Sequence, residues 1–427
     1  MSFPKDFLWG AASASAQIEG AWDQDGRTPS IWDVKMEGKI ANDDTCHTAC
    51  DHYHRYKDDV ALMRTIGLKA YRFSVSWSRV LPARGVVNPK GIEFYQNLVR
   101  ELKAAGIEPM VTLFHSDMPM WVFEDGGWNS ERTVTDFADF AELMVKSLPE
   151  VTYWFTMNEP QCFAPDFIEL APESDEKQVI RVILLSHGEA VRRMRTAANH
   201  PLKIGHVIMG IAMEPVPGAV TEEFAYNRTF SDEAGIRGMG WWTDPMLLGR
   251  VPEPLKDVIS EADIKHINQP LDLFCANVYG AANFMRRPGR PNPLTWPGMP
   301  VSHIKMPVTP DILYWFARMA YKRYNLPVLF TENGFSNIDF VMRDGKVHDP
   351  QRIDYIATYL AGLKRAVEEG VPVEGYLYWS IMDNFEWLYG YDMRFGLIHI
   401  DYRTQKRTLK DSAYYYANVI RTNGEEL

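Results

Sequence analysis

The sequence has few cysteines and no hydrophobic run long enough to cross a membrane. Its 427 residues include four cysteines, Cys46, Cys50, Cys162 and Cys275, scattered along the chain. Scattered thiols in small number are typical of a reducing compartment, where disulfides are rare. No apolar stretch approaches the ~20 residues of a membrane span, and the N-terminal residues lack the basic segment of a secretory signal. We therefore expect a cytoplasmic protein.

Positive charges are fewer than negative ones. The chain carries 45 Lys and Arg against 56 Asp and Glu, a formal net charge of −11. Nucleic acids and anionic membrane surfaces are themselves negative, so this balance disfavours both as partners. No Gly-x-Gly-x-x-Gly or Walker loop follows an expected strand, and no Gly-x-Ser-x-Gly elbow is present. These absences argue against a nucleotide-binding sheet and a serine hydrolase.

Two glutamates in short polar motifs are the strongest functional signal. Glu159 lies in Thr-Met-Asn-Glu-Pro and Glu332 in Phe-Thr-Glu-Asn-Gly. Each follows an apolar run that predicts a buried strand, and a turn former, Pro160 or Gly334, comes soon after. A single glutamate of this kind is commonly a solvated loop residue. A pair at strand ends can flank the anomeric carbon of a sugar, which is what glycoside hydrolysis requires.

Short apolar runs alternate with helical patterns along the whole chain. The runs are continuous, as expected for strands buried on both faces of a parallel sheet. They predict eight strands, Phe7–Ala11, Ala70–Ser74, Pro109–Phe114, Thr152–Met157, Ile204–Ile211, Leu273–Val278, Val328–Thr331 and Gly375–Ser380.

Helical spacing of apolar residues fills several of the intervals. The expected helices are Asp51–Ile66, Lys90–Ala105, Ser130–Leu148, Gln178–Ala197, Pro310–Tyr324 and Pro350–Glu369. Strict alternation without a break in composition predicts one α/β domain over residues 1–427, a closed (β/α)8 TIM barrel. An open doubly wound sheet is the alternative, which the missing glycine-rich loop weakens. Segment 281–309 is rich in Pro, Gly and Arg and is expected to form a long loop at the barrel mouth.

Five motifs in order resemble glycoside hydrolase family 1, the β-glucosidase-type retaining enzymes. They are residues 7–21, which open Phe-Leu-Trp-Gly-Ala-Ala, the segment Tyr-Arg-Phe-Ser-Val-Ser-Trp-Ser-Arg (71–79), Asn-Glu-Pro (158–160), Thr-Glu-Asn-Gly (331–334), and residues 378–387, which end Asn-Phe-Glu-Trp. The resemblance covers essentially the whole chain. One tripeptide is weak evidence, but five motifs in the family's order are not expected by chance.

The resemblance implies a role for each matching residue. Glu159 would be the general acid/base and Glu332 the nucleophile, with Arg72 supporting it. Asn158 would bind the 2-hydroxyl of the sugar, and the other ring hydroxyls would be bound by Gln17, His115, Glu386 and Trp387. Trp379 would lie under the sugar ring, and Trp315 would support the leaving group. Asn277 and Tyr279 would be polar neighbours of the two glutamates.

The chemistry can be stated without the resemblance. In a retaining glycosidase the two carboxyls lie ~5–5.5 Å apart, so the second attacks the anomeric carbon directly. A cation such as Arg72 keeps the nucleophile ionised. Burial and the neighbouring carboxylate keep the acid protonated until the nucleophile is esterified. This chemistry requires no metal or organic cofactor, and its partner is a small β-linked glycoside.

Several other functions remain as alternatives. A 6-phospho-β-glycosidase would need a basic sugar-binding loop, whereas residues 384–392 carry Glu386 and no lysine, and a carboxylate repels a phosphate. A non-catalytic sugar-binding barrel would be expected to lose one carboxylate. A transglycosylase would differ in letting a sugar replace water. Segment 46–54, rich in Cys and His, could hold zinc but is also typical of a helix start, and His206 fits a core position.

Two departures from the family pattern bear on substrate selection. Where the family has His-Trp-Asp-Leu-Pro, residues 115–119 read His-Ser-Asp-Met-Pro. Ser116 therefore predicts either a roomier, less selective pocket or another aromatic residue that fills the gap. Segment 161–173 also lacks the family's usual glycine-rich insertion, which predicts a more open leaving-group side. Glucosides are expected first, with galactosides and fucosides as side substrates, because Gln17 and Glu386 can bind either orientation of the 4-hydroxyl.

Overall fold

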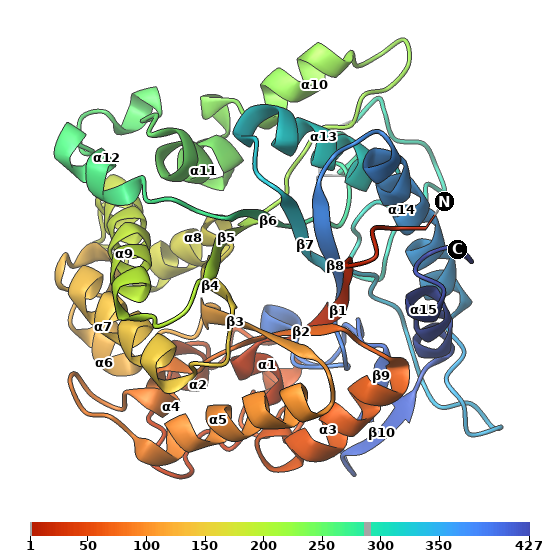
Figure 1. Ribbon diagram of the computed structural model, residues 1–427, viewed down its shortest axis with the longest axis horizontal. Helices are drawn as coiled ribbons and strands as arrows, with labels where there is room; N and C mark the ends of the chain where they lie inside the picture. The colour runs from red at the N-terminus through yellow and green to blue at the C-terminus, as the bar shows by residue number, and fades with distance from the viewer. Residues whose placement is uncertain (1, 286–291) are drawn as a thin grey trace.

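A closed barrel forms the centre of the molecule. The computed structural model describes residues 2–285 and 292–427, and within these residues eight parallel strands pair in sequence order until the last meets the first. Helices surround the barrel (Figure 1). The strands are β1 (Leu8–Ala12), β2 (Ala70–Ser74), β3 (Glu108–Phe114), β4 (Tyr153–Asn158), β5 (Lys203–Met209), β6 (Leu273–Asn277), β7 (Val328–Asn333) and β8 (Val373–Trp379).

Long helices follow most strands and cover the outside of the barrel. They are α3 (His52–Ile66), α5 (Pro89–Ala104), α7 (Arg132–Ser147), α9 (Glu176–Ala197), α13 (Ile312–Tyr324), α14 (Pro350–Glu368) and α15 (Asp411–Arg421). The helix α7 shows why such segments fold in this way. It buries Phe137, Phe140, Ala141 and Met144, at helical spacing along one face.

Shorter elements build the connections. The short α-helices are α1 (Ser15–Ile18), α2 (Ile31–Val34), α4 (Trp77–Val80), α6 (Met120–Glu124), α8 (Pro160–Leu170), α10 (Glu222–Thr229), α11 (Met239–Leu248) and α12 (Glu261–Ile267). The 3-10 helices are η1 (Ala41–Asp43), η2 (Gly127–Asn129), η3 (Asp232–Arg237), η4 (Glu253–Leu255), η5 (Ala282–Phe284) and η6 (Trp387–Tyr389). Two further strands, β9 (Ile398–Asp401) and β10 (Lys406–Leu409), form an antiparallel hairpin. None of the helices in the described part of the chain combines the length and apolar character that a membrane crossing requires.

The barrel has two hydrophobic cores because its strands are buried on both faces. Met110, Phe155, Leu329 and Leu377 belong to a small cluster inside the barrel. The side chains next to them along the strands belong to a much larger cluster that packs under the helices. This arrangement explains the continuous apolar runs of the sequence, since a strand buried on both faces shows no polar alternation.

The predicted elements agree with the structure to within a few residues. Strand β2 has the predicted bounds, and the other seven strands each overlap their predicted runs. All six predicted helices are present, and the open-sheet alternative is wrong because β1 pairs with β8, with Ala12 opposite Trp379. Part of the predicted loop 281–309 lies outside the described residues, and its described part contains η5 and a bridge between Val301 and Pro307.

The parallel order places the carboxyl ends of all eight strands at one end of the barrel, which is where such barrels carry their chemistry.

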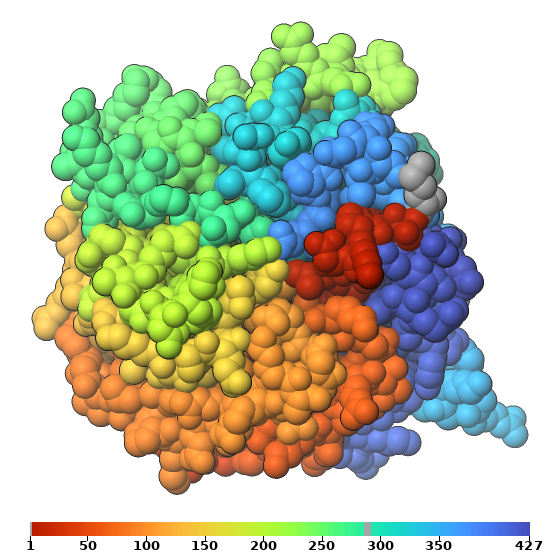
Figure 2. All heavy atoms as spheres, in the orientation of Figure 1, coloured from red at the N-terminus to blue at the C-terminus, as the bar shows by residue number. Residues whose placement is uncertain are grey.

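The long β7–α14 connection, in light blue, projects from the rounded body (Figure 2). Ile338 and Phe340 in this connection are exposed by 67% and 58%. The two chain ends meet at the opposite side of the fold from this chemistry, where the amide of Phe3 donates to the carbonyl of Asn423.

Candidate active site

A cavity of about 270 Å³ opens among the carboxyl ends of the strands, and both predicted catalytic glutamates line it. Glu332 is part of β7, and Glu159 directly follows β4. The cavity lining contains most of the other predicted residues, His115, Asn158, Tyr279, Trp379, Glu386 and Trp387. Strand ends that are far apart in the sequence thus bring these side chains together.

Glu332 is held by two strong donors. Arg72 donates from Nη1 to its Oε1 at 2.8 Å, and the hydroxyl of Tyr279 donates to its Oε2 at 2.7 Å. Burial raises the pKa of Glu332 to about 7, and Glu159 adds to the rise, whereas the guanidinium and the phenol oppose it. Both oxygens of the carboxylate therefore have partners that favour its ionised form.

Glu159 has weaker donors. The side-chain amide of Asn277 donates to its Oε1 at 2.8 Å, and the thiol of Cys162 donates to its Oε2 at 3.3 Å. Burial raises the pKa of Glu159. When two buried carboxyls repel each other, the one with the cationic partner ionises first. The contacts therefore favour a charged Glu332 and a protonated Glu159, which are the states of a nucleophile and an acid.

A short chain of polar groups links the two carboxyls. Asn158 accepts at its Oδ1 from Nη2 of Arg72 at 2.6 Å and from the amide of Asn277 at 3.0 Å. Arg72 also contacts Glu332, and Asn277 also contacts Glu159, so one network positions both. The amide nitrogen of Asn158 lies 3.0 Å from Nε2 of His115, so Asn158 also ties this network to the wall of the cavity.

A third carboxyl, Glu386, faces the same cavity. Burial raises its pKa to about 8, with a further contribution from the charge of Glu332. Gln17 donates from Nε2 to the carbonyl of Phe385 at 2.8 Å and lies 3.4 Å from Glu386. The Oε1 of Gln17 is buried and has no partner among the described residues. The pair thus offers hydrogen-bond acceptors to a hydroxylated ligand.

Aromatic rings form much of the cavity wall. His115 stacks against Trp379 at 5.9 Å and against Trp387 at 5.9 Å, with interplanar angles of 29° and 26°. Burial, with the charge of Arg72, holds the pKa of His115 well below its usual range, which favours the neutral ring. Its Nδ1 has no partner among the described residues. Stacked rings beside free polar atoms suit a sugar, whose ring has apolar faces and polar edges.

Gly334 explains the end of the Thr-Glu-Asn-Gly motif. A Cβ at this position would lie 1.8 Å from the carbonyl oxygen of Trp379. The chain after β7 therefore approaches the end of β8 more closely than any side chain allows. This close approach brings the strand that carries Glu332 against the strand that carries Trp379.

Comparison with known proteins agrees with this geometry. The family model described as "Glycosyl hydrolase family 1" matches residues 1–425. The chain belongs to glycosyl hydrolase family 1. Beta-glucosidase A of Acetivibrio thermocellus is 35% identical, with 99% of each chain covered, and a bifunctional beta-D-glucosidase/beta-D-fucosidase of Bifidobacterium breve is 36% identical, with 98% of each covered. A beta-glucosidase from Thermotoga maritima solved with glucoimidazole superposes with a TM-score of 0.89 at 34% identity, covering 99% of both chains. The protein is thus a glycoside hydrolase.

One residue implied by the family resemblance lies elsewhere. Trp315 is within α13, on the outside of the barrel, and is absent from the described lining of the cavity. Its ring contacts Tyr314 at 4.8 Å, and the guanidinium of Arg318 lies 5.3 Å above it. Trp315 instead lines a separate surface groove with Tyr226. The prediction that it supports the leaving group is therefore corrected.

Two side chains of the Cys- and His-rich segment 46–54 bind carboxylates and do not converge on a common metal position. Cys46 and His52 contact separate carboxylates, those of Asp33 and Asp59, at 3.6 and 2.7 Å. Among the described residues, no three His, Cys, Asp or Glu side chains form a group that could hold a metal ion. Residues 46–50 form turns that lead to α3, and the helix begins at His52, so the end of the segment is the predicted helix start.

Several residues that line the cavity were not predicted. Trp32 and Cys162 line the cavity, as do Ile304 and Met306 from the described part of segment 281–309 and Phe395 beyond Glu386. Cys162 follows Glu159 by three residues within α8, a spacing at which side chains share a helix face. This spacing could have predicted that Cys162 lies beside Glu159. Trp32 lies far from any predicted strand end, so no local pattern indicated it.

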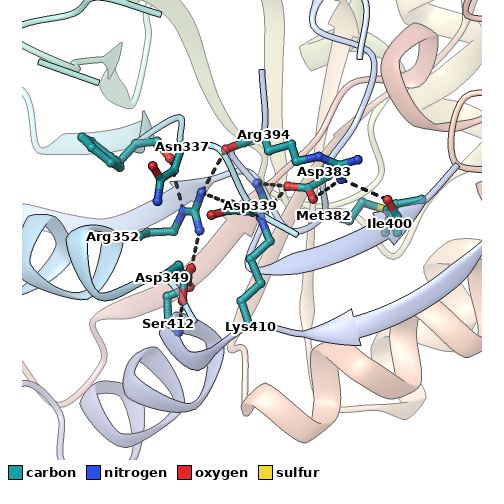
Figure 3. A network of polar contacts seen from close by, with 12 residues as sticks. Asn337, Asp339, Asp349, Arg352, Met382, Asp383, Arg394, Ile400, Lys410 and Ser412 are labelled. Carbon is teal, nitrogen blue, oxygen red and sulfur yellow. Dashed lines mark hydrogen bonds and ion pairs between the residues drawn. The ribbon is translucent and has the colours of Figure 1, made fainter. Parts of the chain in front are cut away.

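The loop that carries Glu386 is anchored by buried charges (Figure 3). Asp383 accepts from Nζ of Lys410 at 2.6 Å and from Nη1 of Arg394 at 2.7 Å. Asp383 and Lys410 are fully buried. Because an unpaired charge is costly in such a place, these contacts restrict the conformation of the loop.

The network continues into the β7–α14 connection. Lys410 also pairs with Asp339 at 2.5 Å, and Arg352 bonds both Asp339, at 2.6 Å, and Asp349. Asp349 in turn accepts from the hydroxyl of Ser412 at 2.6 Å. Three carboxylates thus meet three cations in a closed set (Figure 3). The set joins the segments after β7, β8 and β10.

Proposed function

We propose that this enzyme is a retaining β-glycosidase that removes the terminal β-linked sugar of small glycosides, with glucosides as the main substrates. The observation that carries the proposal is the difference in donors between two carboxyls in one cavity. Glu332 contacts a guanidinium, and Glu159 contacts an amide and a thiol. Retaining hydrolysis needs this pairing of an ionised and a protonated carboxyl.

The proposed reaction has two steps. In the first, Glu332 attacks the anomeric carbon, the bond to the leaving-group oxygen breaks, and Glu159 gives that oxygen its proton. In the second, Glu159, now ionised, takes a proton from water, and the resulting hydroxide displaces Glu332 from the sugar. Esterification removes the negative charge of Glu332, which lowers the pKa of Glu159 for its role as a base.

The remaining cavity residues are proposed to hold the sugar. Gln17 and His115 each have a polar atom without a partner among the described residues, which would bind a ring hydroxyl. Asn158, whose amide nitrogen contacts His115, would use its second N–H for the 2-hydroxyl. The rings of Trp379 and Trp387 would cover the apolar faces of the sugar. In its ionised form Glu386 would accept from two hydroxyls, and its negative charge would then disfavour a phosphorylated sugar. The polar contacts of Asn277 and Tyr279 with the glutamates complete the site.

The relatives support the choice of sugar. The similar proteins of Acetivibrio thermocellus and Thermotoga maritima are named beta-glucosidases, and the Bifidobacterium breve protein is named for glucosidase and fucosidase activity. We therefore place glucosides first and galactosides and fucosides second. A single catalytic domain over residues 1–427 and a cytoplasmic location complete the proposal. Proton transfer and carboxylate attack need no cofactor.

Hydrolysis of a panel of nitrophenyl glycosides tests the proposal. The β-glucoside, β-galactoside, β-fucoside and 6-phospho-β-glucoside are compared, and proton NMR identifies the anomer that forms first. We expect activity on the plain sugars, a β-configured first product and loss of at least ~10⁴-fold in kcat for Glu332→Ala, because the nucleophile is removed. Activity confined to the phosphosugar would favour the phosphoglycosidase alternative, and an α-configured first product would exclude the double displacement.

A further inference from the structure

A small side chain interrupts the aromatic wall of the cavity. Ser116 lines the cavity together with Trp32, His115 and Trp387. The rings of Trp32 and Trp387 lie 4.6 Å apart, and Trp387 stacks on His115. Serine is much smaller than these three rings, so the open space of the cavity can extend toward residue 116, and this space is called the recess below.

The backbone around this recess is fixed, so the neighbouring rings cannot easily close it. Trp32 donates from Nε1 to the main-chain carbonyl of Ser116 at 3.0 Å, which places the indole against the backbone of residue 116. The preceding chain pairs with the segment after Ser116: Ser30 and Pro119 form an antiparallel bridge, and the amide of Ile31 donates to the carbonyl of Met118 at 2.9 Å. Trp32 therefore lines the cavity directly beside residue 116.

The chemistry of the walls indicates what the recess accepts. Trp32 and Trp387 offer ring surface, and Leu388 and Tyr389, exposed by 46% and 47%, extend the apolar lining toward the mouth. His115 beside the recess has a buried Nδ1 without a partner among the described residues, which fits one sugar hydroxyl or its substituted oxygen. Such a surface suits a small group with mainly apolar atoms.

We propose that the recess beside Ser116 accepts a small, mainly apolar substituent on the sugar oxygen that faces His115. The substrate class is then O-alkylated or O-acylated β-glycosides in addition to plain ones. The inference rests on the proposed function, since it concerns the sugar that the two glutamates process. A substituted oxygen can still accept a hydrogen bond from His115, while the carbon atoms of its substituent contact the two indoles.

The test uses nitrophenyl β-glucoside and its four mono-O-methyl ethers, at positions 2, 3, 4 and 6. We expect the wild-type enzyme to hydrolyse one ether with kcat/KM within about tenfold of the plain glucoside. In Ser116→Trp that ether loses at least ~30-fold more in kcat/KM than the plain glucoside, because the indole fills the recess. Ser116→Ala keeps the recess and should keep the wild-type ratio between ether and plain glucoside.

A second variant with a large side chain at position 116 controls for misfolding of the first. Ser116 has a φ of 67°, which strains a bulky residue, whereas histidine tolerates this region better. Ser116→His is therefore compared with Ser116→Trp, and thermal unfolding shows that each variant is folded. Rejection of all four ethers by the wild-type enzyme, or an unchanged ratio in a folded, filled variant, overturns the inference alone. Inactivity on the plain glucoside as well would overturn the proposed function and this inference with it.

Discussion

Removing one hydroxyl beside the nucleophile should change the enzyme's pH dependence in a calculable way. Tyr279→Phe deletes the donor that lies 2.7 Å from Oε2 of Glu332. The ring of Tyr279 packs against Phe395, and its backbone carbonyl accepts from the hydroxyl of Tyr359 at 3.0 Å. Phenylalanine retains both contacts, so the substitution isolates the hydrogen bond to the carboxylate.

The magnitude follows from the charge of the acceptor. A hydrogen bond to an ionised group contributes about 1.5–3 kcal/mol, and about 1.4 kcal/mol corresponds to one pKa unit. The pKa of Glu332, already raised to about 7 by burial, should therefore rise by a further ~1–2 units. Hydrolysis needs the ionised form, so the acidic limb of kcat/KM moves to higher pH. The loss should be about 10–100-fold well below the limb and much smaller above it.

The assay is the pH profile of kcat/KM on nitrophenyl β-glucoside for the wild type, Tyr279→Phe and Tyr359→Phe. Tyr359→Phe is the matched control, because it deletes a buried tyrosine hydroxyl that bonds Tyr279 but touches neither glutamate. We expect its acidic limb to stay at the wild-type position. An unmoved or lowered limb in Tyr279→Phe, or an equal shift in the control, would refute the role of this hydroxyl.

Two further perturbations have distinct readouts. Cys162→Ala removes a weak donor to ionised Glu159. The pKa of Glu159 should therefore rise, and the alkaline limb of kcat/KM should move up by less than about one unit. Cys275→Ala removes a buried thiol that does not contact Glu159 and should leave that limb in place, so an identical shift in both variants would contradict the argument. Lys410→Met leaves Asp383 without one of its cations and should lower the free energy of unfolding by about 3–5 kcal/mol in urea titrations. A change below ~1 kcal/mol would mean that Arg394 and the surrounding dipoles compensate for the lost charge.

The fold could be predicted because each strand has a local signature. Runs such as Ala70–Ser74 are buried on both faces, and helices such as α14 end shortly before a glycine. The predicted and observed strand ends differ for two reasons. The apolar run of β6 continues past Asn277, where the observed strand ends, and β7 includes the polar residues Glu332 and Asn333 beyond its predicted end. Pairing in a barrel depends on neighbouring strands as well as local hydrophobicity, which no single run reveals.

The site was predictable to the level of residues but not of contacts. The motifs identified Glu159, Glu332 and Asn158, and the order of the strands implies that they meet. That Asn158 accepts from both Arg72 and Asn277, and so joins the two carboxyls, depends on side-chain conformations that spacing does not determine. The network around Lys410 was missed for a related reason, since its members lie in three separate segments and show no local motif.

The misplacement of Trp315 shows which part of the resemblance carries weight. The other predicted side chains that line the cavity belong to the end of a strand, to the first two residues after it or to the loop that holds Glu386. Trp315, by contrast, is the fourth residue of α13, within a segment that the sequence itself predicts to be helical. A residue inside an outer helix turns with that helix and packs against its neighbours, here Tyr314 and Arg318. Distance along the chain from a strand's carboxyl end is therefore the better guide to a role in the cavity than a matching tripeptide.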